Sequence, residues 1–218
     1  MKLTVFNGSP RGKSGNTEVF LRHLLHGWTS VEGNEHETFY LRRIRDAEQF
    51  AQAFAGAECV LLAFPLYTDA MPGIVKAFIE SLAPLRGRAG NPPLGFLVQS
   101  GFPEAVHSRH VERYLEKLAA RLGCRYLGTV VRGGGEGARW MPEDHKLFLS
   151  LQAIGRTWAE RGTLDEEQLR ALAKPERFPR ILGPLFQVLL KTKAAQGYWV
   201  RQLEENEAYE ERFARPYE

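Results

Sequence analysis

The chain has 218 residues, of which 44% are hydrophobic and 25% are charged, a composition that excludes disordered, fibrous and repetitive proteins and suits one large domain. Its 29 Lys and Arg residues against 26 Asp and Glu residues leave a net charge of +3, and the sequence shows no clustered basic face, so we expect no nucleic-acid partner. The two cysteines, Cys59 and Cys124, form no C-x-x-C pair, and we expect inert core thiols rather than a metal site.

The sequence gives no signal for secretion or membrane insertion. The opening residues, MKLTVFNGS, are typical of a strand and not of a basic segment followed by a long apolar one, so the sequence predicts a cytoplasmic protein. The most apolar later stretch, residues 181–190, is far shorter than the roughly 20 residues of a membrane helix and contains Gly183 and Pro184. We therefore expect no membrane span.

Short strand-like runs alternate with longer helical patterns over the first 161 residues. Strands are predicted at KLTVFN, ETFYL, CVLLAF, PLGFLVQS and YLGTVVRG, and helices at residues 17–28, 47–54, 72–82, 104–122 and 142–161. Four of the strand runs are almost continuously apolar, which is typical of strands buried on both faces of a parallel sheet. The pattern predicts an α/β fold with a doubly wound five-stranded parallel sheet, whose ligand crevice lies beyond the carboxyl ends of the strands.

After about Thr163 the strand signals stop and the chain reads as helical. We expect a sheet domain over residues 1–163 and a helical C-terminal extension over 164–218, with a proline-rich joint at PERFPRILGP. Five apolar residues of the extension recur at helical spacing: Leu185, Leu189, Ala195, Trp199 and Leu203. Such a face predicts packing on the sheet domain or on a second subunit, the alternative being a lid over a ligand.

The loop after the first strand, GSPRGKSGNT, carries the clearest signal for a site. Its GKS tail looks like a nucleotide P-loop, but that motif requires glycine where Asn7 stands, and the third strand ends without a carboxylate for magnesium. The loop instead offers hydroxyls, an arginine and the free N–H groups of a helix start, a set that suits one phosphomonoester. The candidate phosphate ligands are Ser9, Arg11, Ser14, Asn16 and Thr17. The simpler alternative is that Ser14, Asn16 or Thr17 only caps the helix.

The loop after the third strand, FPLYTDAMPGIVKAF, offers a platform for a flat heteroaromatic ring. We expect Tyr67, beside Pro65, to lie against the ring, and the backbone N–H groups of Leu66 to Thr68 to reach its polar edge. The alternative is that Tyr67 is a buried core residue.

The loop after the fourth strand, QSGFPEAVHSR, is the candidate second wall of the ring site. Ser100 and Gly101 would line that wall, unless Ser100 is hydrogen-bonded only within a local turn. We expect His107 to be solvent-exposed rather than catalytic. After the fifth strand, GGGEGA matches the loose dinucleotide pattern G-x-G-x-x-A, but no strand with an acidic end follows it. We expect residues 133–141 to form a flexible loop that closes over the site.

Taken together, these loops resemble those of the flavodoxin-like NAD(P)H-dependent FMN reductases, also called NAD(P)H-dependent oxidoreductases. GSPRGKSGNT is similar to the family's phosphate loop G-S-x-R-x-x-S-x-[NT], and FPLYTDAMPGIVKAFIE is similar to its flavin-ring loop P-x-Y-x-x-x-x-P-x-x-x-K. The resemblance covers about residues 1–160 and implies the flavodoxin-like strand order 2-1-3-4-5. It implies that the phosphate ligands named above hold FMN, that Pro65, Leu66, Tyr67 and Thr68 frame the isoalloxazine, and that Ser100 and Gly101 line its other side.

The resemblance also implies a reaction and an assembly. Hydride would pass from NADPH or NADH through FMN N5 to a small acceptor such as a quinone, a nitroaromatic, an azo compound, an enone or free flavin. No catalytic side chain and no metal are then expected, because the flavin carries the hydride. Family members are similar in often forming homodimers with the flavin near the interface, which would give the helical extension and Trp199 a role.

Two other readings of the sequence stay open. A flavodoxin-type electron carrier would dock redox proteins without its own nicotinamide turnover, but such carriers resemble acidic proteins, and a net charge of +3 argues against one. A phosphate-loop protein that binds no flavin and acts through its helical extension would stay colourless with added FMN.

Overall fold

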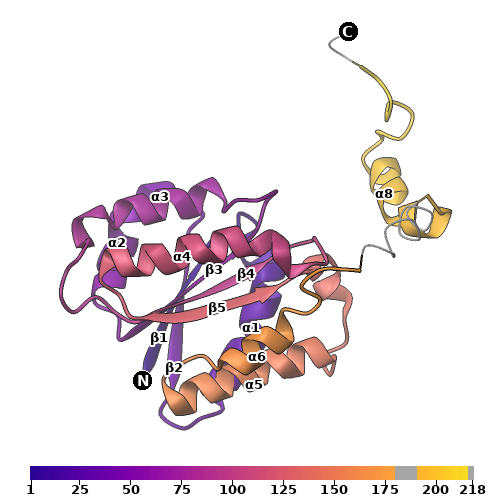
Figure 1. The fold of residues 1–218 in the computed structure, drawn as a ribbon. Helices are drawn as coiled ribbons and strands as arrows, with labels where there is room; N and C mark the ends of the chain where they lie inside the picture. Colours follow the sequence, from indigo (N-terminus) through magenta and orange to yellow (C-terminus); the bar gives the residue numbers. More distant parts are fainter. Residues whose placement is uncertain (180–190, 216–218) are drawn as a thin grey trace. The chain divides into compact units, whose positions relative to one another are not determined.

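A computed structural model describes residues 1–179 and 191–215, and in this part of the chain five strands form one parallel sheet (Figure 1). The strands are β1 (Lys2–Asn7), β2 (Glu35–Tyr40), β3 (Cys59–Pro65), β4 (Leu94–Gln99) and β5 (Tyr126–Arg132). They pair in the order β2-β1-β3-β4-β5. The predicted fold class and strand order are confirmed.

The burial of the strands follows their sequences. β3 and β4 are buried along their whole length, as their continuous apolar runs predict, whereas β2 at the edge is exposed or half-buried and carries the mixed sequence EHETFY. Cys59 and Cys124 are buried free thiols, and burial raises the pKa of each to about 11. Both therefore stay protonated at neutral pH, in agreement with the predicted core thiols.

Five helices match the predicted helical patterns: α1 (Asn16–Thr29), α2 (Ala47–Ala55), α3 (Gly73–Ser81), α4 (Arg109–Leu122) and α5 (Lys146–Arg161). Two of them begin later than expected. A 3-10 helix over Ala105–Ser108 precedes α4, and a turn in which the His145 N–H donates to the Pro142 carbonyl precedes α5. His145 caps α5, because its Nδ1 accepts the Leu147 N–H at 3.2 Å.

Two helical layers enclose the sheet. Helices α2, α3 and α4 cover one face, and α1, α5 and α6 (Glu166–Leu172) cover the other (Figure 1). On the second face α1 and α5 touch backbone to backbone, since a Cβ on Gly155 would lie 1.9 Å from the Leu24 carbonyl oxygen. The Trp28 and Trp158 rings meet edge to face beside this contact, with centroids 5.2 Å apart. The second half of α1 is thereby anchored in a close-packed core.

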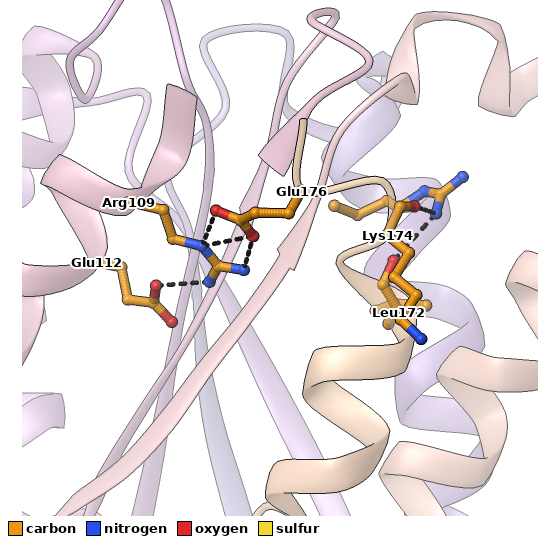
Figure 2. A network of polar contacts seen from close by, with 6 residues as sticks. Arg109, Glu112, Leu172, Lys174 and Glu176 are labelled. Atoms are coloured by element: carbon orange, nitrogen blue, oxygen red, sulfur yellow. Dashed lines mark hydrogen bonds and ion pairs between the residues drawn. The ribbon is translucent and has the colours of Figure 1, made fainter. Parts of the chain in front are cut away.

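The segment 172–176, called the strap here, begins at the last residue of α6 and is bonded to β5 and α4. Arg132 at the end of β5 donates to the carbonyls of Leu172 (3.0 Å) and Lys174 (2.9 Å), and Arg109 forms ion pairs with Glu112 (2.7 Å) and Glu176 (2.6 Å; Figure 2). The Arg109 guanidinium lowers the pKa of Glu176 through its hydrogen bonds. These contacts join the strap to β5 and α4.

The chain divides into two compact units, Met1–Arg177 and Phe178–Glu218. Both α6 and the strap belong to the first unit, which therefore continues past the boundary expected at residue 163; the second unit contains α8 (Lys193–Glu205). Of the apolar face predicted in the extension, Leu185 and Leu189 lie outside the described residues, as does the apolar stretch 181–190, and Trp199 is 64% exposed. None of the described helices is long and apolar enough to cross a bilayer.

Candidate functional site

The loop between β1 and α1 forms an uncapped cradle at a helix start. Gly12–Ser14 make a 3-10 turn, and Gly15 is the N-cap of the 14-residue helix α1 but offers no side chain to its first N–H groups. Among the described residues, no acceptor meets the N–H groups of Asn16 and Thr17. These donors and the helix dipole favour an anion at this position.

Three predicted phosphate ligands surround the cradle. Ser9 is 2% exposed, Asn16 5% and Thr17 0%. A Cβ on Gly15 would lie 2.6 Å from Ser9 Oγ, so a glycine is required for the hydroxyl to approach the helix start. Buried polar groups are costly without partners, and within the described chain Asn16 Oδ1 has none. The phosphate and polyol chain of FMN would supply such partners, so these residues fit the cofactor that the sequence analysis anticipates.

Arg11 and Ser14, the other two predicted phosphate ligands, lie on the exposed outer side of the loop. The Ser14 hydroxyl donates to the Arg11 carbonyl at 2.9 Å, so it stabilises the turn rather than facing the start of α1. Gly12 allows this turn with a φ of +54°, a left-handed conformation that favours glycine. The structure thus separates the five predicted ligands into a buried set and an exposed pair.

A partly buried polar network beneath the cradle was not anticipated from the sequence. Asn7 Oδ1 accepts the Ser9 N–H at 2.9 Å, Asn7 Nδ2 donates to Glu18 Oε2 at 2.8 Å, and Tyr40 Oη donates to Glu18 Oε1 at 2.9 Å. Burial, together with the hydrogen bond to Glu18, raises the pKa of Tyr40 to about 12. The available signal was an amide side chain, that of Asn7, at the end of a buried strand.

The loop after β3 is more exposed than the cradle, and several of its backbone N–H groups already donate to carbonyls of the protein. The Leu66 N–H donates to the Gln99 carbonyl at 2.7 Å, and the Tyr67 N–H donates to the Ala70 carbonyl at 2.9 Å. Of the three backbone donors expected to reach a ring, only that of Thr68 lacks an acceptor among the described residues. Tyr67 is 47% exposed, which excludes the alternative of a buried core tyrosine, and Pro65 and Leu66 are buried.

Thr68 itself adopts a φ of +54°. A β-branched residue is an outlier in this left-handed region, with a cost of about 1–3 kcal/mol. The strain lies in the loop that the sequence assigns to the flavin ring.

The loop after β4 places Ser100 inside a local turn, the alternative that the sequence analysis left open. Its hydroxyl donates to the Phe102 carbonyl at 3.1 Å, and its carbonyl accepts the Gly135 N–H at 2.7 Å. Gly101 is exposed beside it. The Phe102 ring stacks on the half-buried His107 at 4.5 Å, so His107 is less solvent-exposed than expected.

Residues 133–141, expected to be a flexible loop, instead include a 3-10 helix over Gly135–Trp140 that is docked on the other loops. Asn16 Nδ2 donates to the Glu136 carbonyl at 3.2 Å, and Arg139 Nη1 donates to the Ser14 carbonyl at 3.1 Å. A Cβ on Gly135 would lie 2.5 Å from Gln99 Oε1, so the glycine run permits this close approach. The sequence did not predict this 3-10 helix, because its contacts come from distant parts of the chain.

Hydrogen bonds join the loops into one rim at the carboxyl ends of the strands. Gln99 is central, since its Nε2 donates to Thr17 Oγ1 at 3.3 Å and its carbonyl accepts the Leu66 N–H. The cradle, the loop after β3, the loop after β4 and the 3-10 helix after β5 are therefore connected in one network. This is the edge at which doubly wound sheets bind ligands.

Comparison with solved structures identifies proteins of the same fold. An FMN-dependent NADH-azoreductase from Bacillus anthracis in complex with FMN is 13% identical over 74% of this chain and 99% of that protein, with a TM-score of 0.56. An NADH:FMN oxidoreductase in its apo form is 17% identical over 80% of this chain and 96% of that one (TM-score 0.55). An NADPH-quinone reductase from P. pentosaceus is 16% identical over 73% and 98% (TM-score 0.53).

Sequence comparison adds the family. No curated protein matches the chain. The family model described as NADPH-dependent FMN reductase matches residues 1–133, more than half of the chain, and the chain therefore belongs to this family of NAD(P)H-dependent flavin oxidoreductases, whose cofactor is FMN.

Proposed function

We propose that this enzyme uses NAD(P)H and bound FMN to reduce a small acceptor, namely a quinone, a nitroaromatic, an azo compound or free flavin. The observation that carries the proposal is the uncapped cradle, in which buried Ser9, Asn16 and Thr17 surround the start of α1. A phosphate monoester with two negative charges gains there from charge-assisted hydrogen bonds and from the helix dipole.

The proposal gives the protein a binding and orienting role. Ser9, the Asn16 and Thr17 N–H groups, and the charge of Arg11 hold the phosphate, and the exposed hydroxyl of Ser14 keeps the loop closed. Pro65 to Thr68 and Ser100 with Gly101 frame the ring on two adjacent strands. The chemistry supplied by bound FMN is the acceptance of a hydride from the nicotinamide and its delivery to the acceptor.

The acceptor class is supported by two aromatic side chains and by the fold comparisons. Tyr67 and Phe102 are 47% and 40% exposed in the loops that follow the adjacent strands β3 and β4, and such surfaces suit a flat, apolar acceptor. Proteins of similar fold are described as an azoreductase and a quinone reductase.

The test is a visible spectrum of the purified protein after FMN is added and the excess removed, followed by anaerobic NADPH and NADH. We expect the yellow bands to stay with the protein and to bleach rapidly with a nicotinamide, after which acceptors are compared. Retained flavin that bleaches only with dithionite would favour the electron carrier instead. A protein that retains no flavin would refute the proposal.

We also propose a homodimer, which the family resemblance implies. A groove of about 430 Å³ lies between the loop after β3 and α4 and has an apolar wall of Met71, Val111 and Tyr114. Its other lining residues are Asp69, Ala70, Lys76 and His110. Light scattering after size exclusion should then give twice the chain mass of 24.7 kDa. A mass of one chain at micromolar concentration would contradict it. A cytoplasmic location stays a prediction of the sequence.

A further inference from the structure

A second cavity, called the basic basin here, lies beside the cradle on the side of the edge strand β2. It has a volume of about 750 Å³. Its charged and aromatic lining includes Arg11, Lys13, Tyr40, Arg42, Arg43 and Asp46. Ser9, Asn16 and Thr17 do not line it, so the basin is separate from the buried side of the cradle.

The lining of the basin carries excess positive charge. It contains four cationic side chains and one carboxylate, a net charge of +3 that is still +2 without Arg11, which the proposed function assigns to the FMN phosphate. Asp46 already lies 3.9 Å from Arg45 outside the lining. Among the ion pairs of the described residues, none engages Arg11, Lys13, Arg42 or Arg43. Arg109, by contrast, contacts two carboxylates. Unpaired like charges around one cavity repel one another, and an anion bound there would relieve that repulsion.

The backbone and an aromatic wall position these cations. The stem of Arg42 lies over the phosphate loop, because a Cβ on Gly12 would stand 2.9 Å from Arg42 Cδ. The Lys13 ammonium lies 5.7 Å from the centroid of the Tyr40 ring, and Glu18 fixes that ring through the Tyr40 hydroxyl. The same glycine turn that shapes the cradle therefore also makes room for the arginine of the basin.

We propose that the basic basin binds the phosphate-bearing adenosine half of a dinucleotide. Its volume is that of a nucleotide-sized pocket rather than of a single phosphate. Arginine forks and a lysine recognise phosphate oxygens, and the aromatic wall offers a surface to a nucleoside. The inference rests on the proposed function, because two dinucleotides of flavoenzyme chemistry carry such a group: NADPH with its 2′-phosphate and FAD with its second phosphate.

The direct test is calorimetric titration of the FMN-loaded protein with adenosine 2′,5′-bisphosphate and with ADP, followed by FAD against FMN on the apoprotein. The variant is R42A/R43A, and its matched control is R86A/R88A, which removes two exposed arginines from the loop before β4, at the amino ends of the strands and therefore away from the basin. We expect R42A/R43A to lower the affinity for the phosphorylated adenosine ligand about tenfold or more, while the affinity for FMN stays unchanged. The control should change neither.

The ligand arms identify the source of the group. Weaker binding of the 2′,5′-bisphosphate alone, with a matching loss of kcat/KM for NADPH but not for NADH, assigns the basin to NADPH. Weaker binding of ADP and of FAD, with the affinity for FMN unchanged, assigns the basin to the adenosine half of FAD. The proposal is overturned if each ligand binds R42A/R43A as tightly as it binds the parent protein. It is also overturned if the parent protein binds none of the phosphorylated adenosine ligands. FMN retention by the parent is scored separately, so a failure of the proposed function is distinguishable from a failure of the basin.

Discussion

The two ends of the candidate flavin site differ in how completely the protein builds them. At the phosphate end, Ser9, Asn16 and Thr17 are buried and supported from below by Asn7. At the ring end, Tyr67 and Thr68 are exposed, and Thr68 is held in a strained conformation. A preorganised phosphate site provides affinity at low entropic cost, whereas an exposed loop can vary with the acceptor. We therefore expect the phosphate end to determine the affinity for FMN and the ring end to determine which acceptor is reduced.

The largest effect should follow from removing the phosphate ligands. We expect S9A/R11A to weaken FMN binding about 100-fold, near 3 kcal/mol, because charge-assisted hydrogen bonds are lost. Fluorescence titration of FMN measures the dissociation constant, with S150A/R121A as a control at two exposed positions of α5 and α4. Unchanged affinity would show that the phosphate binds elsewhere.

A smaller effect on cofactor affinity is expected at the ring end. Y67A should lower the affinity for FMN about tenfold, because stacking on the ring is lost. It should also raise the KM for the acceptor more than the KM for the nicotinamide. The control is Y198A, a tyrosine of similar exposure (41%) in the second unit. If Y67A weakened FMN as strongly as S9A/R11A does, the division of labour between the two ends would be wrong.

The strain at Thr68 predicts an effect on stability. T68N should raise the free energy of unfolding by about 0.5–1 kcal/mol, because asparagine tolerates a positive φ better than a β-branched residue does. Urea denaturation of the two proteins measures the difference. T163N, at an exposed position outside the left-handed region, should show no such gain. A loss of stability in T68N would mean that the threonine makes compensating contacts.

The smallest effect concerns the helix that carries the cradle. His23 on α1 is buried, stacks on Phe148 at 3.9 Å, and has its pKa lowered by burial, with Glu143 partly opposing this shift. The unfolded chain therefore binds the proton more readily, so stability is complete above about pH 6.5 and falls as the pH drops below it. Urea denaturation at pH 7.5 and 5.5 should show a larger fall for the parent than for H23Q, by less than about 1 kcal/mol. Equal falls would exclude His23 as the cause.

Features encoded by neighbouring residues were predictable from the sequence. The apolar runs of β3 and β4 indicated buried parallel strands, and the spacing within residues 8–17 indicated an anion site because a helix start and its ligands are adjacent in the chain. The exposure of Ser14 was not predictable, because its hydroxyl can equally well face a ligand or bond the Arg11 carbonyl.

Features assembled by the fold were not predictable from pattern alone. The basic basin joins Lys13 to Arg42 and Arg43, and a scan for basic runs misses such a cluster because β1 and β2 bring distant segments together. The 3-10 helix after β5 was expected to be irregular, since its glycines are typical of loops. Its order comes from hydrogen bonds to Asn16 and Ser100, which no local pattern records.

The strap has a practical consequence for dissecting this enzyme. A polypeptide that stops at residue 163 would deprive Arg132 of the Leu172 and Lys174 carbonyls and Arg109 of Glu176. Burial already lowers the pKa of Arg132, so its charge would be left poorly compensated at the end of β5, next to the loop after β4. Truncation of the chain from its C-terminus should therefore be tolerated down to Arg177. A fusion partner or affinity tag placed after Arg177 would leave the first unit, Met1–Arg177, intact.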